Sequence, residues 1–308
     1  MAVVSALASA AALSAGSFAT LVGGPAVPLL PLGHANHVPH PGPPHRPPPP
    51  PPSTTTTTTT LPPTTTTTTI ASSGPSDPSG QAPPSATAYP GYTQALVDDF
   101  NGSSLNQTTW NGFYQAPTHV DGPWLASHGS VAGGMITMSE YQDPALNNEW
   151  VGTGLCTRSS WTSGMAFVRA RADVGARVSV VFGLIGVSTW PPEIDFYEDM
   201  PTTNTRQYFT ATTHYGPNDS MVVKANSTVD ATQWHTYGVA WNSSTITYYV
   251  DGTAWATIPN PEPSGTHALD LPQKLFMQIE TYDDNLPTSA TPKVVNLNVD
   301  WVAVYTPA

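Results

Sequence analysis

Cysteine is almost absent from this sequence, since Cys156 is the only one among 308 residues. A single cysteine cannot form a disulfide within the chain or build a metal site from several thiolates. Cys156 ends the apolar run Gly154-Leu155-Cys156, so we interpret it as a buried core residue. An intermolecular thiol is the alternative.

Charge is also scarce, and basic charge most of all. Charged residues make up 10% of the chain, with 9 Lys+Arg against 21 Asp+Glu and a formal net charge of −12. Such a balance provides no cationic surface for nucleic acid or for anionic lipid. Repulsion also disfavours polyanionic substrates, so we expect a neutral partner.

The scarce charges divide the chain into two segments. Before about residue 90, Arg46 and Asp77 are the only charged residues other than histidine, and Ala, Pro, Thr and Ser dominate. After that point Trp, Tyr, Phe and Asp occur at the density of an ordinary globular protein. The second segment has roughly 218 residues, which is enough for one domain with a large core.

The first residues favour export from the cell. Residues 2–15 are small and apolar, and Ser17-Phe18-Ala19 offers small residues at the −3 and −1 positions of a cleavage site. The apolar stretch is shorter than the roughly 20 residues that a membrane span requires. No Lys or Arg precedes it, which departs from the usual pattern. We predict a signal peptide over residues 1–25, secretion, and no insertion in a membrane.

A Pro/Thr-rich stalk is predicted over residues 26–92. Residues 47–52 are all Pro, and residues 54–60 and 64–69 are all Thr. This composition is typical of extended, O-glycosylated spacers and cannot bury enough apolar surface to fold. The stalk would hold the domain away from another module or from a surface such as the cell wall. Four histidines near its start (His34, His37, His40 and His45) are read as part of a disordered polar tract, with weak metal binding as the alternative.

The remaining segment, residues 93–308, has the pattern of a β protein. Five β-branched or aromatic runs predict strands: 178–182, 207–213, 245–250, 274–279 and 299–305. The run at 245–250 leads into Asp251-Gly252, a typical hairpin turn. No stretch of ten residues shows a convincing helical period. We therefore predict a two-sheet antiparallel sandwich.

Acidic residues concentrate in one short stretch. Glu193, Asp195, Glu198 and Asp199 fall within seven residues, and Glu193 and Asp195 alternate with apolar residues as in a strand. Strict alternation would turn Glu198 towards the core. A one-residue β-bulge near residues 196–197 would return Glu198 to the polar face, and bulges often occur beside active sites.

The predicted bulge brings the acids within catalytic range. Glu193 and Glu198 would lie about 13 Å apart at Cα, which leaves roughly 5 Å between carboxylates that lean together. That gap is close to the separation of about 5–5.5 Å in retaining glycosidases. Three carboxylates with Asp195 between them cannot all ionise independently, so at least one keeps its proton to higher pH. A solvated acidic face on an edge strand is the alternative interpretation.

The hexapeptide Glu193-Ile-Asp195-Phe-Tyr-Glu198 resembles the E-x-D-x-x-E signature of glycoside hydrolase family 16 in its longer, bulged form, as in laminarinases. Further segments that resemble this family extend over about residues 95–306: 99–102 with Trp110, 164–171, 213–215, 234–241, 249–252 and 300–305. The resemblance implies a jelly roll of two curved sheets with a substrate cleft along the concave sheet. It also implies that Glu193 is the nucleophile, that Glu198 is the general acid/base, and that Asp195 orients Glu193.

Other site residues are assigned with alternatives. Trp190 is expected to stack on a sugar ring, or else to pack in the core, and His214 to contact sugar near the acids. Arg169 would bond a sugar hydroxyl or a carboxylate, with a structural ion pair as the alternative. Gln278 stands where many members have Asn, and Ala240 where an acidic residue is usual. Both changes could alter sugar subsites.

The resemblance also implies a possible structural calcium. Several members hold the ion with the Asp that matches Asp300, together with backbone carbonyls, and oxygen ligands suit calcium. No organic cofactor is expected, because the reaction requires only carboxylates and water. We expect the protein to act as a monomer on a neutral polysaccharide.

Together these features predict a secreted retaining endo-glycosidase that acts on β-1,3- or mixed β-1,3/1,4-glucan. Two alternatives remain open. One is a hydrolase or transglycosylase of another polysaccharide, such as a galactan or a bacterial exopolysaccharide. The other is a non-catalytic glycan-binding module, because fold alone does not determine function.

Overall fold

The structure, a computed structural model, describes residues 77–118, 122–282 and 285–308. This part of the chain forms sixteen strands and two short 3₁₀ helices, Ala126–His128 and Pro144–Leu146. The strands are β1 (Tyr92–Asp98), β2 (Trp110–Phe113), β3 (Gly129–Ala132), β4 (Met135–Asp143), β5 (Glu149–Val151), β6 (Thr153–Thr157), β7 (Gly164–Ala172), β8 (Ser179–Gly186), β9 (Glu193–Asp199), β10 (Phe209–Tyr215), β11 (Ser220–Asn226), β12 (His235–Trp241), β13 (Thr245–Val250), β14 (Thr253–Pro259), β15 (Gln273–Glu280) and β16 (Val294–Pro307). The predicted all-β class is confirmed.

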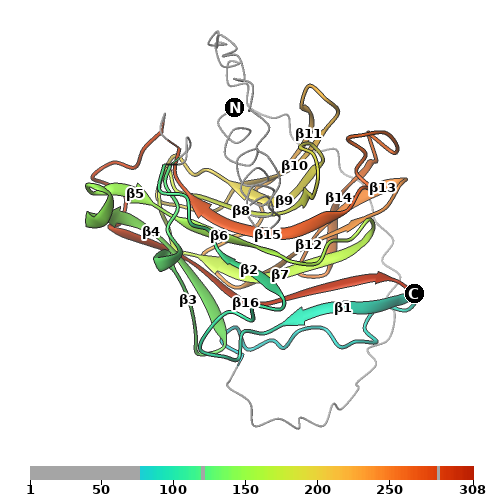
Figure 1. Cartoon of the computed structure of the whole chain (residues 1–308), viewed down its shortest axis with the longest axis horizontal. Coiled ribbons are helices and arrows are strands. Elements are labelled where there is room, and N and C mark those ends of the chain that lie inside the picture. The colour runs from blue at the N-terminus through green and yellow to red at the C-terminus, as the bar shows by residue number, and fades with distance from the viewer. Residues whose placement is uncertain (1–76, 119–121, 283–284) are drawn as a thin grey trace, which may run out of the picture. The chain divides into compact units, whose positions relative to one another are not determined.

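The strands form two antiparallel sheets that stack as two layers (Figure 1). The seven-stranded sheet has the order β11-β10-β9-β8-β15-β6-β2. The nine-stranded sheet has the order β14-β13-β12-β7-β16-β4-β3, with β1 paired to β16 and β5 paired to β4. The long strand β16 runs beside β4, β7 and β1 in turn. This is the two-sheet jelly-roll sandwich that the sequence predicts.

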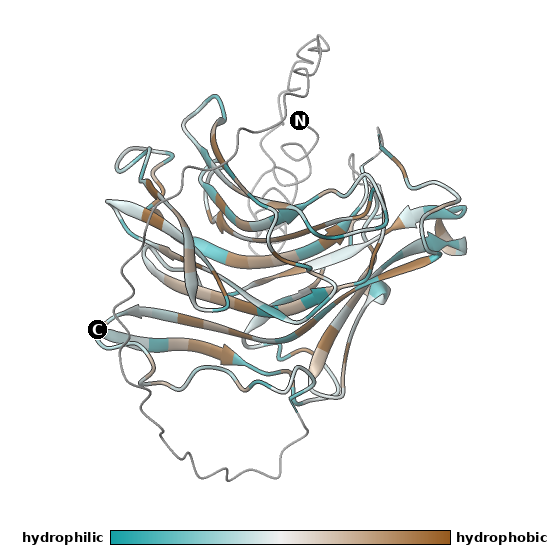
Figure 2. Ribbon diagram, turned by 180° about the vertical axis from the view of Figure 1, so that it is seen from behind, coloured by the Kyte–Doolittle hydropathy of each residue, from teal (hydrophilic) through white to brown (hydrophobic). Residues whose placement is uncertain are grey.

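The hydrophobic core lies between the two sheets. Val180, Phe182 and Leu184 of β8 belong to it, as do Val168 and Ala170 of β7. These residues are two positions apart because successive side chains of a strand point to opposite faces. Figure 2 shows hydrophobic and hydrophilic residues interspersed along the strands. Each sheet therefore has one face in the core and a second face that points away from it, although in β8, β9 and β15 the residues of both faces are buried.

The hairpin between β13 and β14 forms where the sequence predicts it. Asp251 and Gly252 connect the strands, with φ angles of 48° and 76°. Positive φ at both central residues is the type I′ geometry, whose twist matches that of the flanking strands. The turn also places the Asp251 side chain beside β12, where it accepts a hydrogen bond from the backbone N–H of Thr236 (2.9 Å).

The domain begins earlier than predicted, because residues 77–91, which we call the strap, pack on the nine-stranded sheet. The contacts include hydrogen bonds from Trp301 Nε1 to Gln81 O (2.6 Å) and from Tyr305 OH to Pro84 O (2.7 Å), and stacking of Tyr89 on Phe167 at 5.3 Å. The composition of the strap resembles that of the stalk, but its carbonyls satisfy aromatic donors on this sheet. The boundary therefore moves from residue 93 to about residue 77.

The predicted signal peptide (1–25) and the rest of the predicted stalk lie outside the described residues. Within the described part of the chain, no helix has the length and apolar character needed to cross a membrane.

Candidate active site

The acidic cluster lies on β9, next to the centre of the seven-stranded sheet. Ile194 and Phe196 belong to the core, so Glu193 and Asp195 point to the opposite face, which we call the carboxylate face. The register with β10 shifts between Glu198↔Thr210 and Asp195↔Thr212, and that with β8 shifts beside Phe196. One extra residue on β9 therefore returns Glu198 to the carboxylate face, as the predicted bulge requires.

Strand β10 provides a polar partner opposite each acid. His214 pairs with Glu193, Thr212 with Asp195, and Thr210 with Glu198. Directly opposite residues of an antiparallel pair lie close enough for their side chains to interact. The sequence of β10 alone did not identify Thr210 and Thr212 as part of the site, because only their register beside β9 does so.

Each acid has a different set of hydrogen-bond partners. Trp190 Nε1 donates to Glu193 Oε2 at 2.8 Å, and Thr212 Oγ1 donates to Glu198 Oε2 at 2.7 Å. Neither oxygen of Asp195 accepts a hydrogen bond from the described residues, and one oxygen each of Glu193 and Glu198 is likewise without a partner. The open oxygens are those that a substrate, a proton or a cation can meet.

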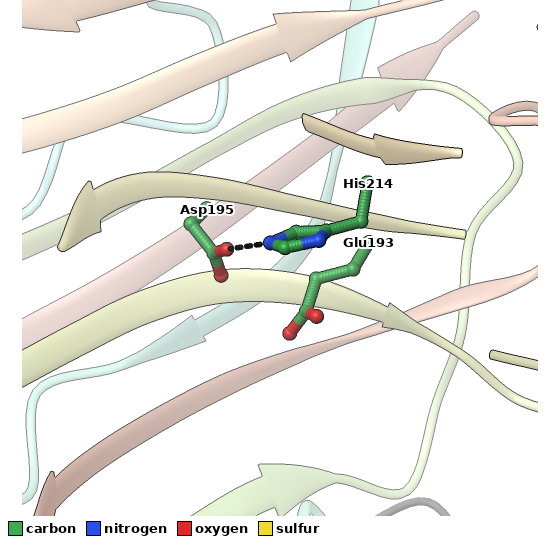
Figure 3. Close-up of side chains that lie close together, drawn as sticks. All are labelled: Glu193, Asp195 and His214. Atoms are coloured by element: carbon green, nitrogen blue, oxygen red, sulfur yellow. Dashed lines mark ion pairs between the residues drawn. The ribbon is translucent and has the colours of Figure 1, made fainter. Parts of the chain in front are cut away.

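His214 lies between the carboxylates of Asp219 and Asp195, and Figure 3 shows the contact with Asp195. Its Nδ1 is 2.7 Å from Asp219 Oδ1, and its Nε2 is 3.6 Å from Asp195 Oδ2. The bond to Asp219 fixes the ring, so that Nε2 faces the acids. His214 was predicted to lie near the catalytic centre, and it does. Asp219 lies in the turn between β10 and β11, and nothing in its local sequence marks it as part of the site.

Burial raises the pKa values of all three acids. Burial raises the pKa of Glu193 well above its ordinary value, the charge of Asp195 adds to this, and His214 opposes it. Burial, followed by the charge of Glu198, raises the pKa of Asp195 well above its ordinary value. Burial also raises the pKa of Glu198, against the hydroxyl of Thr212. Burial therefore favours the protonated form of each acid.

Glycine at position 183 makes room for Asp195. Gly183 of β8 lies directly opposite Asp195. A Cβ at this position would be 2.5 Å from Asp195 Oδ1 and would also clash with the ring of Phe276. Any side chain here would displace the central acid, so the glycine is part of the site's geometry.

Gln278 lies on the carboxylate face, two strands from β9. It pairs with Val181, which in turn pairs with Glu198. Its Nε2 donates to Glu280 Oε1 at 2.7 Å, and the hydroxyl of Tyr282 donates to the same oxygen at 2.9 Å. Gln278 therefore belongs to a second polar group on this face, together with Glu280 and Tyr282. Its hydrogen bond is to Glu280 and not to the acids of β9.

Two predicted site residues lie on the other sheet. Arg169 of β7 bonds Ser79 Oγ at 3.1 Å and pairs with Asp251 at 3.5 Å. Arg169 therefore forms a structural ion pair, which was the alternative in the sequence analysis. Its assignment to substrate binding is corrected. Asp300 of β16 accepts the backbone N–H of Ser79 at 3.0 Å, so it also contacts the strap rather than the acids.

A buried ion pair holds the end of β9. Arg206 donates to both oxygens of Asp199 at 2.6 Å, and both side chains are fully buried. Arg206 also donates to the backbone carbonyls of Asp173 and Val178. Because Asp199 directly follows Glu198, this pair anchors the catalytic strand just after the bulge.

One group in the described part of the chain has the composition of a metal site. Glu193, Asp195 and His214 each offer a ligand atom, and these atoms lie within 4.8 Å of one another. The arrangement thus combines three carboxylates, an oriented imidazole and an indole donor on one face. Such a group suits glycosidic cleavage by paired carboxylates.

Comparisons with known proteins agree with this geometry. Over 204 residues the chain is 30% identical to the endo-1,3-1,4-beta-glycanase ExsH of Rhizobium meliloti. This match covers 55% of this chain and 43% of that protein. It is 23% identical to the endo-1,3-1,4-beta-glycanase EglC of the same organism, over 69% of this chain and 51% of that protein. The chain thus spans about half the length of these curated relatives.

A solved structure shows the same fold. The endo-beta-1,3-glucanase from Pyrococcus furiosus superposes with a TM-score of 0.61 at 20% sequence identity, over 70% of this chain and 95% of that one. The family model of glycosyl hydrolases family 16 matches residues 119–302, a range that contains the whole carboxylate face of β9. The chain therefore belongs to glycosyl hydrolases family 16.

Proposed function

We propose that this protein is a secreted endo-glycosidase that hydrolyses β-1,3- or mixed β-1,3/1,4-glucan with retention of configuration. The observation that carries the proposal is the set of three acids on one face of a bulged strand. The names of the two bacterial relatives, both endo-1,3-1,4-beta-glycanases, support the substrate class.

Glu193 is proposed as the nucleophile. Its carboxylate attacks the anomeric carbon and forms a glycosyl ester as the leaving oxygen departs. The indole N–H of Trp190 holds one oxygen (2.8 Å), which leaves the other free for the attack. Trp190 is therefore proposed to orient Glu193, and it can do so while its ring stacks on a sugar.

Glu198 is proposed as the general acid and then the general base. It gives its proton to the leaving oxygen in the first step and takes one from the attacking water in the second. The hydroxyl groups of Thr212 and Thr210, at 2.7 and 3.2 Å, hold one of its oxygens. The bulge sets the distance to Glu193, for which about 5 Å remains our prediction, in the range of retaining enzymes.

Asp195 is proposed to position Glu193 and to keep a proton in the coupled group. A protonated Asp195 can donate a hydrogen bond to the nucleophile and so reduce the repulsion among the acids. His214, fixed by Asp219, directs its Nε2 at Asp195.

The possible structural calcium stays part of the proposal. Asp300 Oδ1 is buried and accepts no hydrogen bond from the described residues, so it offers one oxygen of the kind that calcium prefers. Calcium there would tie β16 to the strap through its charge. Asp300 is the only ligand we assign, and an increase in the melting temperature on adding calcium after chelation would support it.

Activity is tested with the full chain on laminarin, lichenan, agarose and a succinoglycan-type polysaccharide, with reducing-end release as the readout. We expect cleavage of laminarin or lichenan, and a loss of at least about 10³-fold in Glu193→Gln. The matched control is Glu149→Gln, which changes an exposed glutamate of β5. Cleavage of agarose or succinoglycan alone would correct the substrate class. Unchanged hydrolysis by Glu193→Gln would refute the mechanism.

Azide separates the two catalytic roles. In Glu193→Ala, azide replaces the missing nucleophile and attacks the face opposite the leaving group, so the product is an α-glycosyl azide. In Glu198→Ala with an activated aryl glycoside, azide attacks the glycosyl ester and gives the β-glycosyl azide. The reverse pattern of products would exchange the roles of the two residues.

A further inference from the structure

The group formed by Glu193, Asp195 and His214 has a property that the glycosidase mechanism does not use. Its three ligand atoms come from neighbouring positions on β9 and β10 and lie within 4.8 Å of one another. His214 is fully buried, and its Nε2 has no hydrogen-bond partner among the described residues. Figure 3 shows this nitrogen directed at Asp195.

The second ring nitrogen of His214 is arranged as in metal-binding histidines. A histidine that binds a metal commonly donates its other N–H to a carboxylate, which fixes the tautomer and makes the ligating nitrogen more basic. Here Nδ1 lies 2.7 Å from Asp219 Oδ1. With Nδ1 protonated, Nε2 carries a lone pair, and it faces a carboxylate oxygen 3.6 Å away. A cation between the two would satisfy both.

We infer that Glu193, Asp195 and His214 form a binding site for a transition-metal dication such as Zn²⁺. An imidazole with two carboxylates favours zinc or copper over calcium or magnesium, which prefer oxygen ligands alone. Ligands about 2.1 Å from a tetrahedral zinc are about 3.4 Å from one another. The pair of His214 and Asp195 already matches this spacing, and a small shift of Glu193 completes it.

Such an ion would block the proposed reaction. It would occupy the free oxygen of the nucleophile, since the other oxygen of Glu193 accepts the indole N–H of Trp190. Three protein ligands leave one position for water, and a sugar ring would have to displace the ion to reach Glu193. The inhibitory consequence rests on the proposed function, whereas the binding of the metal does not.

Isothermal titration of the untagged full chain with Zn²⁺ tests the site. His34, His37, His40 and His45 are first replaced by Ala, because this cluster near the start of the stalk could bind zinc on its own. In that background we expect one Zn²⁺ per chain. Ca²⁺ and Mg²⁺ should not compete for this site.

Further variants in the same background assign the ligands. His214→Gln should lose at least about tenfold in affinity, and Asp219→Asn should lose about 10–100-fold as an outer partner of the ligating ring. The matched control is His235→Gln, since His235 also pairs with an aspartate, Asp251 at 2.6 Å, but on the nine-stranded sheet. It should leave the affinity unchanged. Circular dichroism and melting temperatures show whether each variant folds.

The two outcomes can be told apart. If no glycan is cleaved but one Zn²⁺ binds and depends on His214, the metal site stands and the proposed function fails. If the enzyme is active, Zn²⁺ should inhibit it competitively with the glucan, and EDTA should restore activity. No Zn²⁺ binding, or equal binding by the His214→Gln variant, would overturn the inference.

Discussion

Glu140 gives a quantitative test of the packing between the sheets. It lies on β4, two residues beyond Met138, and so points into the core. One carboxyl oxygen accepts the hydroxyl of Thr281 at 3.1 Å, and the other has no hydrogen-bond partner among the described residues. Burial raises its pKa well above the ordinary value of 4.5. The hydroxyl of Thr281 opposes the shift, and the charge of Glu280 adds to it.

The sign of the effect on stability follows from this shift. Between the pKa of the unfolded chain and the raised pKa of the folded protein, the folded state binds one proton more. The stability that protonated Glu140 contributes is therefore fully present below about pH 4.5 and is lost as the pH rises towards the folded pKa. The slope is about 1.4 kcal/mol per pH unit, or about 3–5 °C in melting temperature for a domain of this size.

The variant Glu140→Gln keeps the shape of the protonated acid but has no proton to lose. We expect its melting temperature to exceed that of the wild type increasingly between pH 5 and pH 7, by about 3–5 °C per pH unit. Calorimetry at each pH gives the difference, which cancels the titration of all other groups. The exposed Glu149→Gln variant should follow the wild type. Parallel curves for Glu140→Gln and the wild type would refute the reasoning.

Three further predictions follow from the packing around β9 and the strap. Gly183→Ala forces a methyl group against the central acid, so we expect kcat to fall at least about tenfold and stability by about 1–3 kcal/mol, while Gly102→Ala, whose added methyl group would make only an ordinary contact with Ser104 O at 3.4 Å, changes neither. Arg206→Met removes one partner of a buried ion pair and leaves the Asp199 carboxylate unpaired, so denaturant titration should show a loss of about 3–5 kcal/mol. A chain beginning at residue 91 should melt several degrees below one beginning at residue 77, because it lacks the strap; equal melting temperatures would contradict the strap contacts.

The sequence predicts much of the fold, because strands and turns depend on neighbouring residues. The alternation of β-branched and aromatic residues located the strand at 245–250, and Asp251-Gly252 located its turn. The strap was missed for the opposite reason. Its Pro- and Ser-rich composition matches the stalk, and the residues that hold it in place are distant in sequence, such as the aromatic donors of β16 more than 200 positions away.

The candidate site was predictable only in part. The three acids of β9 share one short segment, and their spacing alone required the bulge. Asp219, Thr212 and Gly183 come from other segments, and nothing in their local sequence marks them. Arg169 was misplaced because its strand, β7, lies close to the acidic segment in the sequence. In the fold, β7 belongs to the other sheet.

The bulge connects these levels in one physical argument. Without the extra residue, Glu198 would point between the sheets, where an ionised carboxylate costs several kcal/mol. With the extra residue, Phe196 and Tyr197 both enter the core, and Glu198 joins Glu193 and Asp195 on the carboxylate face. Both aromatic rings pack against Phe182 in the core and thus stabilise the register that crowds three acids together. The glycosidase proposal needs the three acids close together, although they then repel one another, and a cation would relieve this repulsion. The hydrophobic packing on the opposite side of the same strand therefore offsets it.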